Sequence, residues 1–103
     1  MHRKYMGITL LNTTPEQEHF FSTLTQKTDA LTVEAAFRKD IELFTPDEDR
    51  VKQNKLAWDQ FKASMQKGDE LWLYNDKRAL VGSRGVAIKR GNLVPSIFVL
   101  YYA

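Results

Sequence analysis

The strongest constraint on the fold is a change of hydrophobic period at Gly68. Before it, residues 46–67 carry apolar side chains at helical spacing, with Trp58 and Phe61 on one stripe. After it, apolar and aromatic residues come in short runs separated by polar turns, which is typical of strands. The 103 residues are too few for two ordinary domains, so we expect a single domain spanning residues 1–103.

Cap and turn signals divide the chain into one N-terminal strand, three helices and three C-terminal strands. Thr14-Pro15 is a helix start, and residues 45–48 form a capping box with proline at the first helical position. The expected strands are 5–11, 70–74, 85–89 and 93–102, and the expected helices are 15–27, 33–43 and 46–67. The order β-α-α-α-β-β-β predicts an α+β fold, with an antiparallel sheet and helices packed on one face.

Composition excludes several classes of protein. The absence of cysteine removes disulfides, thiolate nucleophiles and cysteine-ligated metal sites. The apolar run at residues 8–11 is too short for a signal-peptide core or a membrane span, so we expect a cytoplasmic protein with no membrane partner. The 15 basic and 13 acidic residues nearly balance, which does not indicate a dedicated nucleic-acid binder.

The polar motifs have structural interpretations. His19 and Glu16 read as a solvated pair on a helix surface, and the acidic residues 47–49 fit the first turn of a helix. Residues 82–85 (GSRG) fit a turn or bulge better than a phosphate-binding nest, because a strand follows them. No nucleophile has a suggested base, so we predict no catalytic residues, no metal, no cofactor and no enzymatic activity.

The final strand is apolar on both faces. A half-exposed strand alternates apolar and polar residues, whereas this run does not. If helices cover one face only, either another part of the same chain wraps the other face or a second copy of the chain covers it, and we favour the second copy. We therefore predict a homodimer through the sheet, within a non-catalytic interaction or regulatory protein. The expected interface residues are Ile97, Phe98, Val99, Leu100 and Tyr101.

Two alternative functions stay open. Three helices followed by a hairpin resemble a winged-helix layout, in which basic residues of the meander contact nucleic acid. Those residues are Lys77, Arg78, Arg84, Lys89 and Arg90. The acidic start of the third helix argues against this alternative, because it would repel phosphates. The second alternative is a small apolar-ligand site between helices and sheet. Its lining would be Trp58, Phe61, Trp72 and Tyr74, which are also ordinary core residues.

The C-terminal third resembles a hairpin of short uncharacterised bacterial proteins. The residues that carry the resemblance are 69–74 (DELWLY) and 82–92 (GSRGVAIKRGN), which give the pattern DELWxY…GxRGxAxxRxG. The resemblance implies a bacterial or mobile-element source and brings no function with it. Function therefore has to be sought from the arrangement of the residues themselves.

Overall fold

A computed structural model describes residues 3–36, 48–79 and 81–102. The strands are β1 (Arg3–Leu10), β2 (Leu24–Thr28), β3 (Glu70–Asp76), β4 (Ser83–Arg90) and β5 (Leu93–Tyr102). The helices are α1 (Thr14–Ser22) and α3 (Glu48–Ala63), and residues 30–36 are also helical. The expected α+β class is confirmed.

The five strands form one antiparallel sheet in the order β1-β5-β4-β3-β2. The predicted meander of the last three strands is present, and β1 pairs with β5 at its far side. Strands β1 and β2 are the two edges of the sheet, although they are consecutive strands in the chain. The chain therefore passes from one edge of the sheet to the other through α1.

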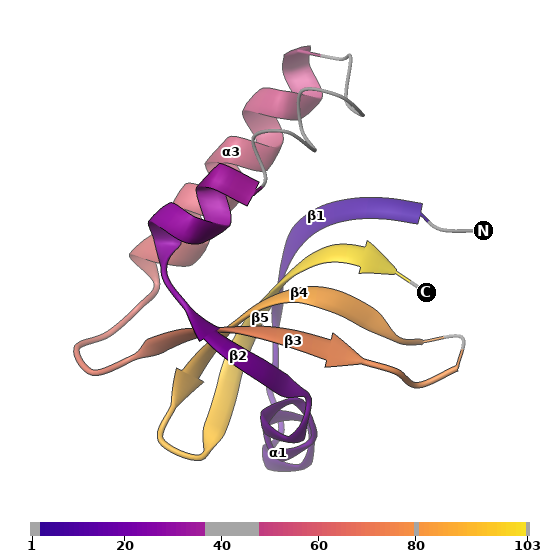
Figure 1. Cartoon of the computed structure of the whole chain (residues 1–103), viewed down its shortest axis with the longest axis vertical. Helices are drawn as coiled ribbons and strands as arrows, with labels where there is room; N and C mark the ends of the chain where they lie inside the picture. The colour runs from indigo at the N-terminus through magenta and orange to yellow at the C-terminus, as the bar shows by residue number, and fades with distance from the viewer. Residues whose placement is uncertain (1–2, 37–47, 80, 103) are drawn as a thin grey trace.

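One face of the sheet packs against α3 and the helical residues 30–36 (Figure 1). We call this hydrophobic cluster the α3-side cluster; it consists of Val33, Trp58, Phe61, Leu71, Val86, Ile88, Phe98 and Leu100. Its centre is aromatic. The ring of Phe61 stacks on Trp58 at 5.8 Å and meets Phe98 at 5.6 Å. Burying a side chain of this size contributes about 2–3 kcal/mol, so α3 is firmly anchored.

The opposite face packs against α1. This second cluster, the α1-side cluster, consists of Leu11, Phe20, Tyr74, Ala87, Val94, Ile97 and Val99. Successive side chains of β5 enter opposite clusters, because side chains of a strand alternate between its two faces. Figure 1 shows α3 and α1 on opposite sides of the sheet. Helices therefore lie on both faces, whereas the sequence predicted one face.

The expected helix 15–27 is too long, because α1 ends at Ser22 and β2 follows at Leu24. Thr23 is the C-cap, and its backbone N–H donates to the carbonyl oxygen of Phe20. The helix start predicted at Thr14-Pro15 is capped by Thr13, whose hydroxyl accepts from the backbone N–H of Glu16. The observed order is β-α-β-α-α-β-β-β.

The other two expected helices are partly described. The segment 33–43 is helical over its described part, and that helix begins at residue 30. The capping box at 45–48 lies outside the described residues at positions 45–47. Helix α3 ends at Ala63, not at residue 67, and Gly68 lies beyond it in a turn with a φ of 89°.

Two glycines permit close backbone approach around β4. A Cβ on Gly85 would lie 2.1 Å from the carbonyl oxygen of Phe98, where the β4–β5 register shifts. A Cβ on Gly82 would lie 2.4 Å from the carbonyl oxygen of Asp76. Of the turn or bulge predicted for 82–85, the structure has the bulge: residues 83–85 belong to β4, whose register with β5 shifts between Arg84 and Gly85.

Candidate functional site

Two clusters of charged side chains lie at the two ends of β3. Side chains of Glu70 and Asp76 share the face that carries α1, six residues apart on the same strand. At about 3.4 Å per residue, they are about 20 Å apart. The two ends are therefore separate clusters, and each can be described alone.

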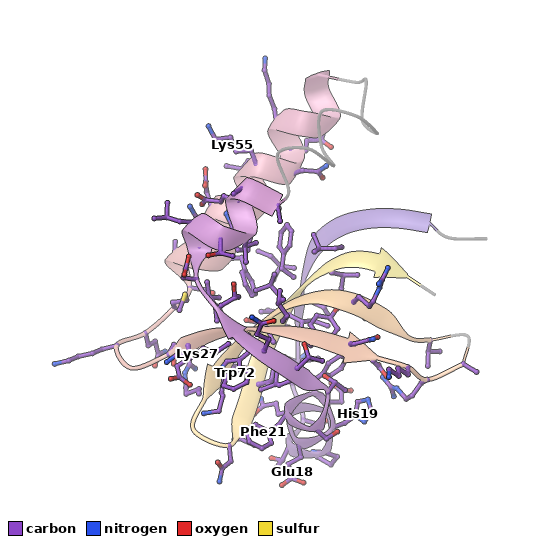
Figure 2. The ribbon with its side chains drawn as sticks, viewed as in Figure 1. Glu18, His19, Phe21, Lys27, Lys55 and Trp72 are labelled. Atoms are coloured by element: carbon purple, nitrogen blue, oxygen red, sulfur yellow. The ribbon has the colours of Figure 1, made fainter. Side chains whose placement is uncertain are left out.

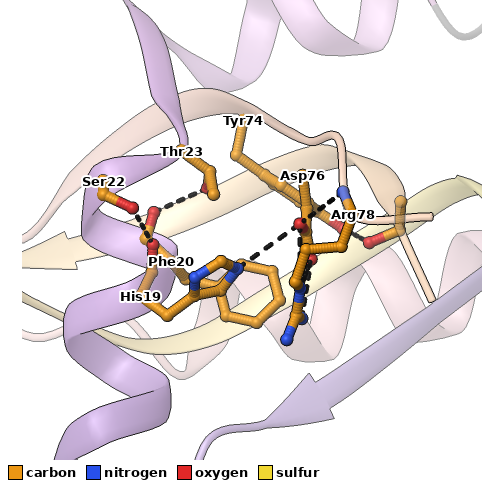
Figure 3. Close-up of polar contacts among 8 residues, drawn as sticks. His19, Phe20, Ser22, Thr23, Tyr74, Asp76 and Arg78 are labelled. Atoms are coloured by element: carbon orange, nitrogen blue, oxygen red, sulfur yellow. Dashed lines mark hydrogen bonds and ion pairs between the residues drawn. The ribbon is translucent and has the colours of Figure 1, made fainter.

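The first cluster, at the carboxyl end of β3, is centred on Asp76 (Figure 3). The side chain of Asp76 is 1% exposed, and the guanidinium of Arg78 donates to both of its oxygens at 2.7–3.1 Å. Burial disfavours the charged carboxyl, but the hydrogen bonds from Arg78 outweigh it and hold the pKa of Asp76 below its ordinary value. This carboxylate is ionised and paired.

His19 approaches the same carboxylate from α1. Its Nε2 is buried and lies 3.3 Å from Oδ1 of Asp76, within ion-pair distance. The contact does not have the geometry of a hydrogen bond, and Nε2 of His19 has no other hydrogen-bond partner among the described residues. The sequence placed His19 with Glu16 on a solvated helix surface. The structure instead turns it inward, so that it joins α1 to β3.

Aromatic and hydroxyl groups complete this cluster. The ring of Phe20 meets Tyr74 edge-on at 5.5 Å, and the guanidinium of Arg78 lies 5.9 Å from the Phe20 ring centre. The hydroxyls of Tyr74 and Ser83 form a buried hydrogen bond at 2.9 Å. Each of these contacts connects α1, β3 or β4 to a neighbour. The cluster therefore ties three elements of the fold together.

The second cluster, at the amino end of β3, is centred on Glu70. Its carboxylate pairs with Lys27 of β2 at 2.7 Å and with Lys89 of β4 at 3.4 Å, and it accepts from the indole N–H of Trp72 at 3.2 Å. These contacts, that with Lys27 first, lower the pKa of Glu70 to about 2. Figure 2 shows Lys27 and Trp72 close together at this end of the sheet, with Lys55 apart on α3.

Asp69 adds an ion pair beside this cluster. Its side chain is 2% exposed and receives two hydrogen bonds from Arg90, at 2.8 and 3.0 Å. The hydrogen bonds from Arg90 lower the pKa of Asp69. A general acid needs a pKa raised toward neutrality, whereas all three carboxyl pKa values are lowered. These acids are suited to holding strands together rather than to transferring protons.

The predicted ligand-binding aromatics do not line one site. Trp58 and Phe61 belong to the α3-side cluster, and Tyr74 belongs to the α1-side cluster on the opposite face of the sheet. Trp72 is half-buried and projects on the same face as Tyr74. Because the sheet separates the two pairs, they cannot surround one small molecule.

The predicted nucleic-acid residues are divided between the two ends of the β3–β4 hairpin. Lys77, Arg78 and Arg84 lie near its turn, and Lys89 and Arg90 lie at its other end. Arg78 pairs with Asp76, Lys89 with Glu70 and Arg90 with Asp69. The helices do not have the winged-helix arrangement either, because α1 and α3 pack on opposite faces of a sheet.

The predicted dimer-interface residues are buried inside the chain. Phe98 and Leu100 lie under α3, and Ile97 and Val99 lie under α1, all 8% exposed or less. The side chain of Tyr101 lies outside the described part. The doubly apolar strand is explained within one chain, so it no longer requires a second copy to cover it. A homodimer, if formed, would use another surface than these buried residues of β5.

Sequence reasoning missed the acidic partners Asp69, Glu70 and Asp76. The available signal was their spacing, since Glu70 and Asp76 are an even number of residues apart on one strand and so share a face. Among the described residues, no group of three or more His, Cys, Asp and Glu side chains could hold a metal ion.

Comparison with known proteins adds no relative. No protein family, no curated protein and no solved structure matches this chain. Within the described residues, none of the helices has the length and apolar character needed to cross a bilayer. The function must therefore be argued from the fold and its surface.

Proposed function

We propose that this chain is a non-catalytic interaction protein that pairs with a second copy of itself through the β1 edge of its sheet. The observation that carries the proposal is an exposed aliphatic side chain on an edge strand. Leu10 of β1 is 66% exposed, and β5 is the only strand paired with β1 in the described part of the chain. An edge of this kind offers backbone groups to another strand.

The direction of the backbone groups supports pairing at this edge. The N–H of Leu11 donates to the carbonyl oxygen of Pro95 at 3.0 Å, so Leu11 faces β5. Backbone groups alternate in direction along an antiparallel strand, so those of Ile8 and Leu10 face the free edge. Two copies related by a two-fold axis could pair these residues, which would place Leu10 against an apolar neighbour.

The other edge is less suited to pairing. Strand β2 has five residues, whereas β1 has eight. Both edges have a register shift and a lysine, Lys27 in β2 and Lys4 in β1, so these features do not separate them. Short length is one of the features by which natural sheets discourage edge-to-edge association. The faces are also unsuitable, because both are covered by helices. This leaves β1 as the favoured edge.

The lowered pKa values support the non-catalytic part of the proposal. Asp69, Glu70 and Asp76 are all held in the ionised form by basic neighbours. The pairs of Asp69 and Glu70 join different parts of the sheet, whereas the pair of Asp76 with Arg78 is local. Their geometry accounts for their presence without a reaction. The resemblance of the hairpin and the composition lead us to propose a bacterial, cytoplasmic setting as well.

The test is the solution mass by light scattering over a range of protein concentrations, at low and high salt. We expect a dimer whose dissociation constant changes little with salt, because its contacts are backbone hydrogen bonds and apolar side chains. The Leu10→Lys variant should raise the dissociation constant about tenfold or more, since two copies of Leu10 lose their apolar contact.

The matched control is Val81→Lys, which changes an equally exposed aliphatic residue (60%) in the turn between β3 and β4. It should leave the dissociation constant unchanged. A monomer at all concentrations would contradict self-association. A dimer weakened by Val81→Lys and not by Leu10→Lys would contradict the use of the β1 edge.

A further inference from the structure

A continuous segment, residues 14–28, crosses the α1 face of the sheet from one edge to the other. We call it the α1–β2 strap; it contains α1, Thr23 and β2. The strap follows strand β1 and ends with strand β2, and these two strands are the opposite edges of the sheet. A flat sheet of five strands is about 19 Å across, and a nine-residue helix is about 13.5 Å long, so α1 bridges most of this width.

Little of the strap is buried. Phe20 is the buried residue of α1, whereas none of the five residues of β2 is fully buried. The surface beneath the strap is, in contrast, densely apolar. It includes Tyr74, Ala87, Val94, Ile97 and Val99, all 2% exposed or less. The strap therefore covers a core that it enters with one fully buried side chain, Phe20, and two partly buried ones, Phe21 and Leu24.

Besides the backbone pairing of β2 with β3, two side-chain contacts join the strap to β3. His19 meets Asp76 near one end of the strap, and Lys27 meets Glu70 near the other. Both carboxylates also have a partner that lies outside the strap. Asp76 is held by Arg78, and Glu70 is held by Lys89 and by the indole of Trp72.

These second partners lower the cost of releasing the strap. Removing one member of a buried ion pair is strongly unfavourable when it leaves the other charge alone. Of the two carboxylates, only Asp76 is buried, and Arg78 would remain paired with it; Glu70 is 32% exposed and would keep Lys89. The strap can separate from the sheet without stranding a buried charge.

We propose that the α1–β2 strap opens as one unit while β1, β5, β4 and β3 stay paired, so that it acts as a removable cover over the α1-side cluster. Opening exposes the apolar residues beneath α1 and the outer edge of β3. This conformational device goes beyond the proposed self-association and does not depend on it, because it is a property of each chain. Elements with few buried contacts are those that open locally in native proteins.

Hydrogen exchange of single amides, followed by NMR, tests the proposal. The decisive amide is that of Asn75 in β3, which donates to the carbonyl oxygen of Thr23 in the strap at 3.0 Å. Its neighbour Asp76 faces β4, because amides alternate in direction along a strand. We expect the Asn75 amide to exchange at the same rate as the amides of the strap. The Asp76 amide should exchange as slowly as the amides of β4 and β5.

Variants make the test independent of one mutation. Phe20→Ala should speed exchange of the strap and of Asn75 by about tenfold or more, while β4 and β5 keep their protection. Lys27→Gln removes one contact and should speed the same amides by about twofold to fivefold. The control is Lys52→Gln, an exposed lysine of α3, which should change neither.

Two results would contradict the opening of the strap. If the amides of the strap exchanged at the same rate as those of β4 and β5, the strap would open only in global unfolding and the proposal would be wrong. The same conclusion would follow if Phe20→Ala sped exchange uniformly across all strands. A monomeric protein that showed the expected pattern would refute self-association and support the strap.

Discussion

Replacing Phe61 by alanine tests whether α3 is fixed to the sheet as described. Phe61 is 0% exposed, and its ring packs between Trp58 of its own helix and Phe98 of β5. Truncation removes the buried ring and leaves a cavity, which costs about 3–5 kcal/mol in well-packed cores. Domains of this size have a total stability of about 5–15 kcal/mol, so about a fifth or more of it should be lost.

The assay is urea unfolding followed by circular dichroism. The Phe61→Ala midpoint should fall while the slope stays constant, and the melting temperature should fall by at least about 12 °C. The matched control is Leu56→Ala on the same helix, where the side chain is 59% exposed and the expected loss is about 0.5 kcal/mol or less. Equal losses for the two variants, or a loss below about 1 kcal/mol for Phe61→Ala, would refute this packing.

Three further predictions follow from the sheet. Gly85→Ala should lower the free energy of unfolding by about 2 kcal/mol or more, because its Cβ would meet the carbonyl oxygen of Phe98. Gly91→Ala should cost only about 1 kcal/mol, since its Cβ would meet nothing and only its positive φ matters. Similar losses in urea titrations would contradict the close approach. Asp76→Asn should lower the free energy of unfolding by about 1–3 kcal/mol, because it removes the charge that Arg78 binds. Asp59→Asn, on the exposed side of α3, should leave the free energy of unfolding nearly unchanged. Equal losses for the two variants would argue against a buried ion pair. The lowered pKa of Glu70 means that its contribution to stability is present above its ordinary pKa of 4.5 and is lost as pH falls toward about 2. In acid unfolding curves, the Glu70→Gln variant should therefore lose less free energy of unfolding than the unmodified chain as pH falls through this range. If the free energy of unfolding fell equally steeply with pH in both, the result would argue against the pairs with Lys27 and Lys89.

Much of the C-terminal sheet could be predicted from the sequence, because local signals there agree. The strands after Gly68 contain aromatic and aliphatic runs, and turns of asparagine and glycine type separate them. Helix α3 was equally predictable from its single apolar stripe. These elements each carry enough local signal to be recognised without knowledge of their neighbours.

Strand β2 could not be predicted in the same way. Its residues are mostly exposed and polar, so no alternating pattern marks it. No glycine or proline separates it from α1, and the helix stops at Thr23 without either residue. The strand forms because β3 offers an unpaired edge, which is a tertiary cause that the local sequence does not contain.

The candidate site also depended on tertiary contacts. Pairing of His19 with Asp76, and of Arg90 with Asp69, joins residues that are 57 and 21 positions apart in the sequence. The dimer prediction preferred a second copy of the chain to an intramolecular cover for the second face of β5. It rested on helices packing on one face, and the position of α1 beneath Ile97 and Val99 removes that premise.

Isotope-filtered NMR on a mixture of labelled and unlabelled chains tests the central claim most directly, because it separates contacts within a chain from contacts between chains. The account predicts that the contacts of Phe61 with Phe98 and of Phe20 with Tyr74 are intramolecular. It also predicts that contacts between chains arise from residues 7–10 of β1. Intermolecular contacts at Phe98 or Ile97 with none at β1 would contradict it.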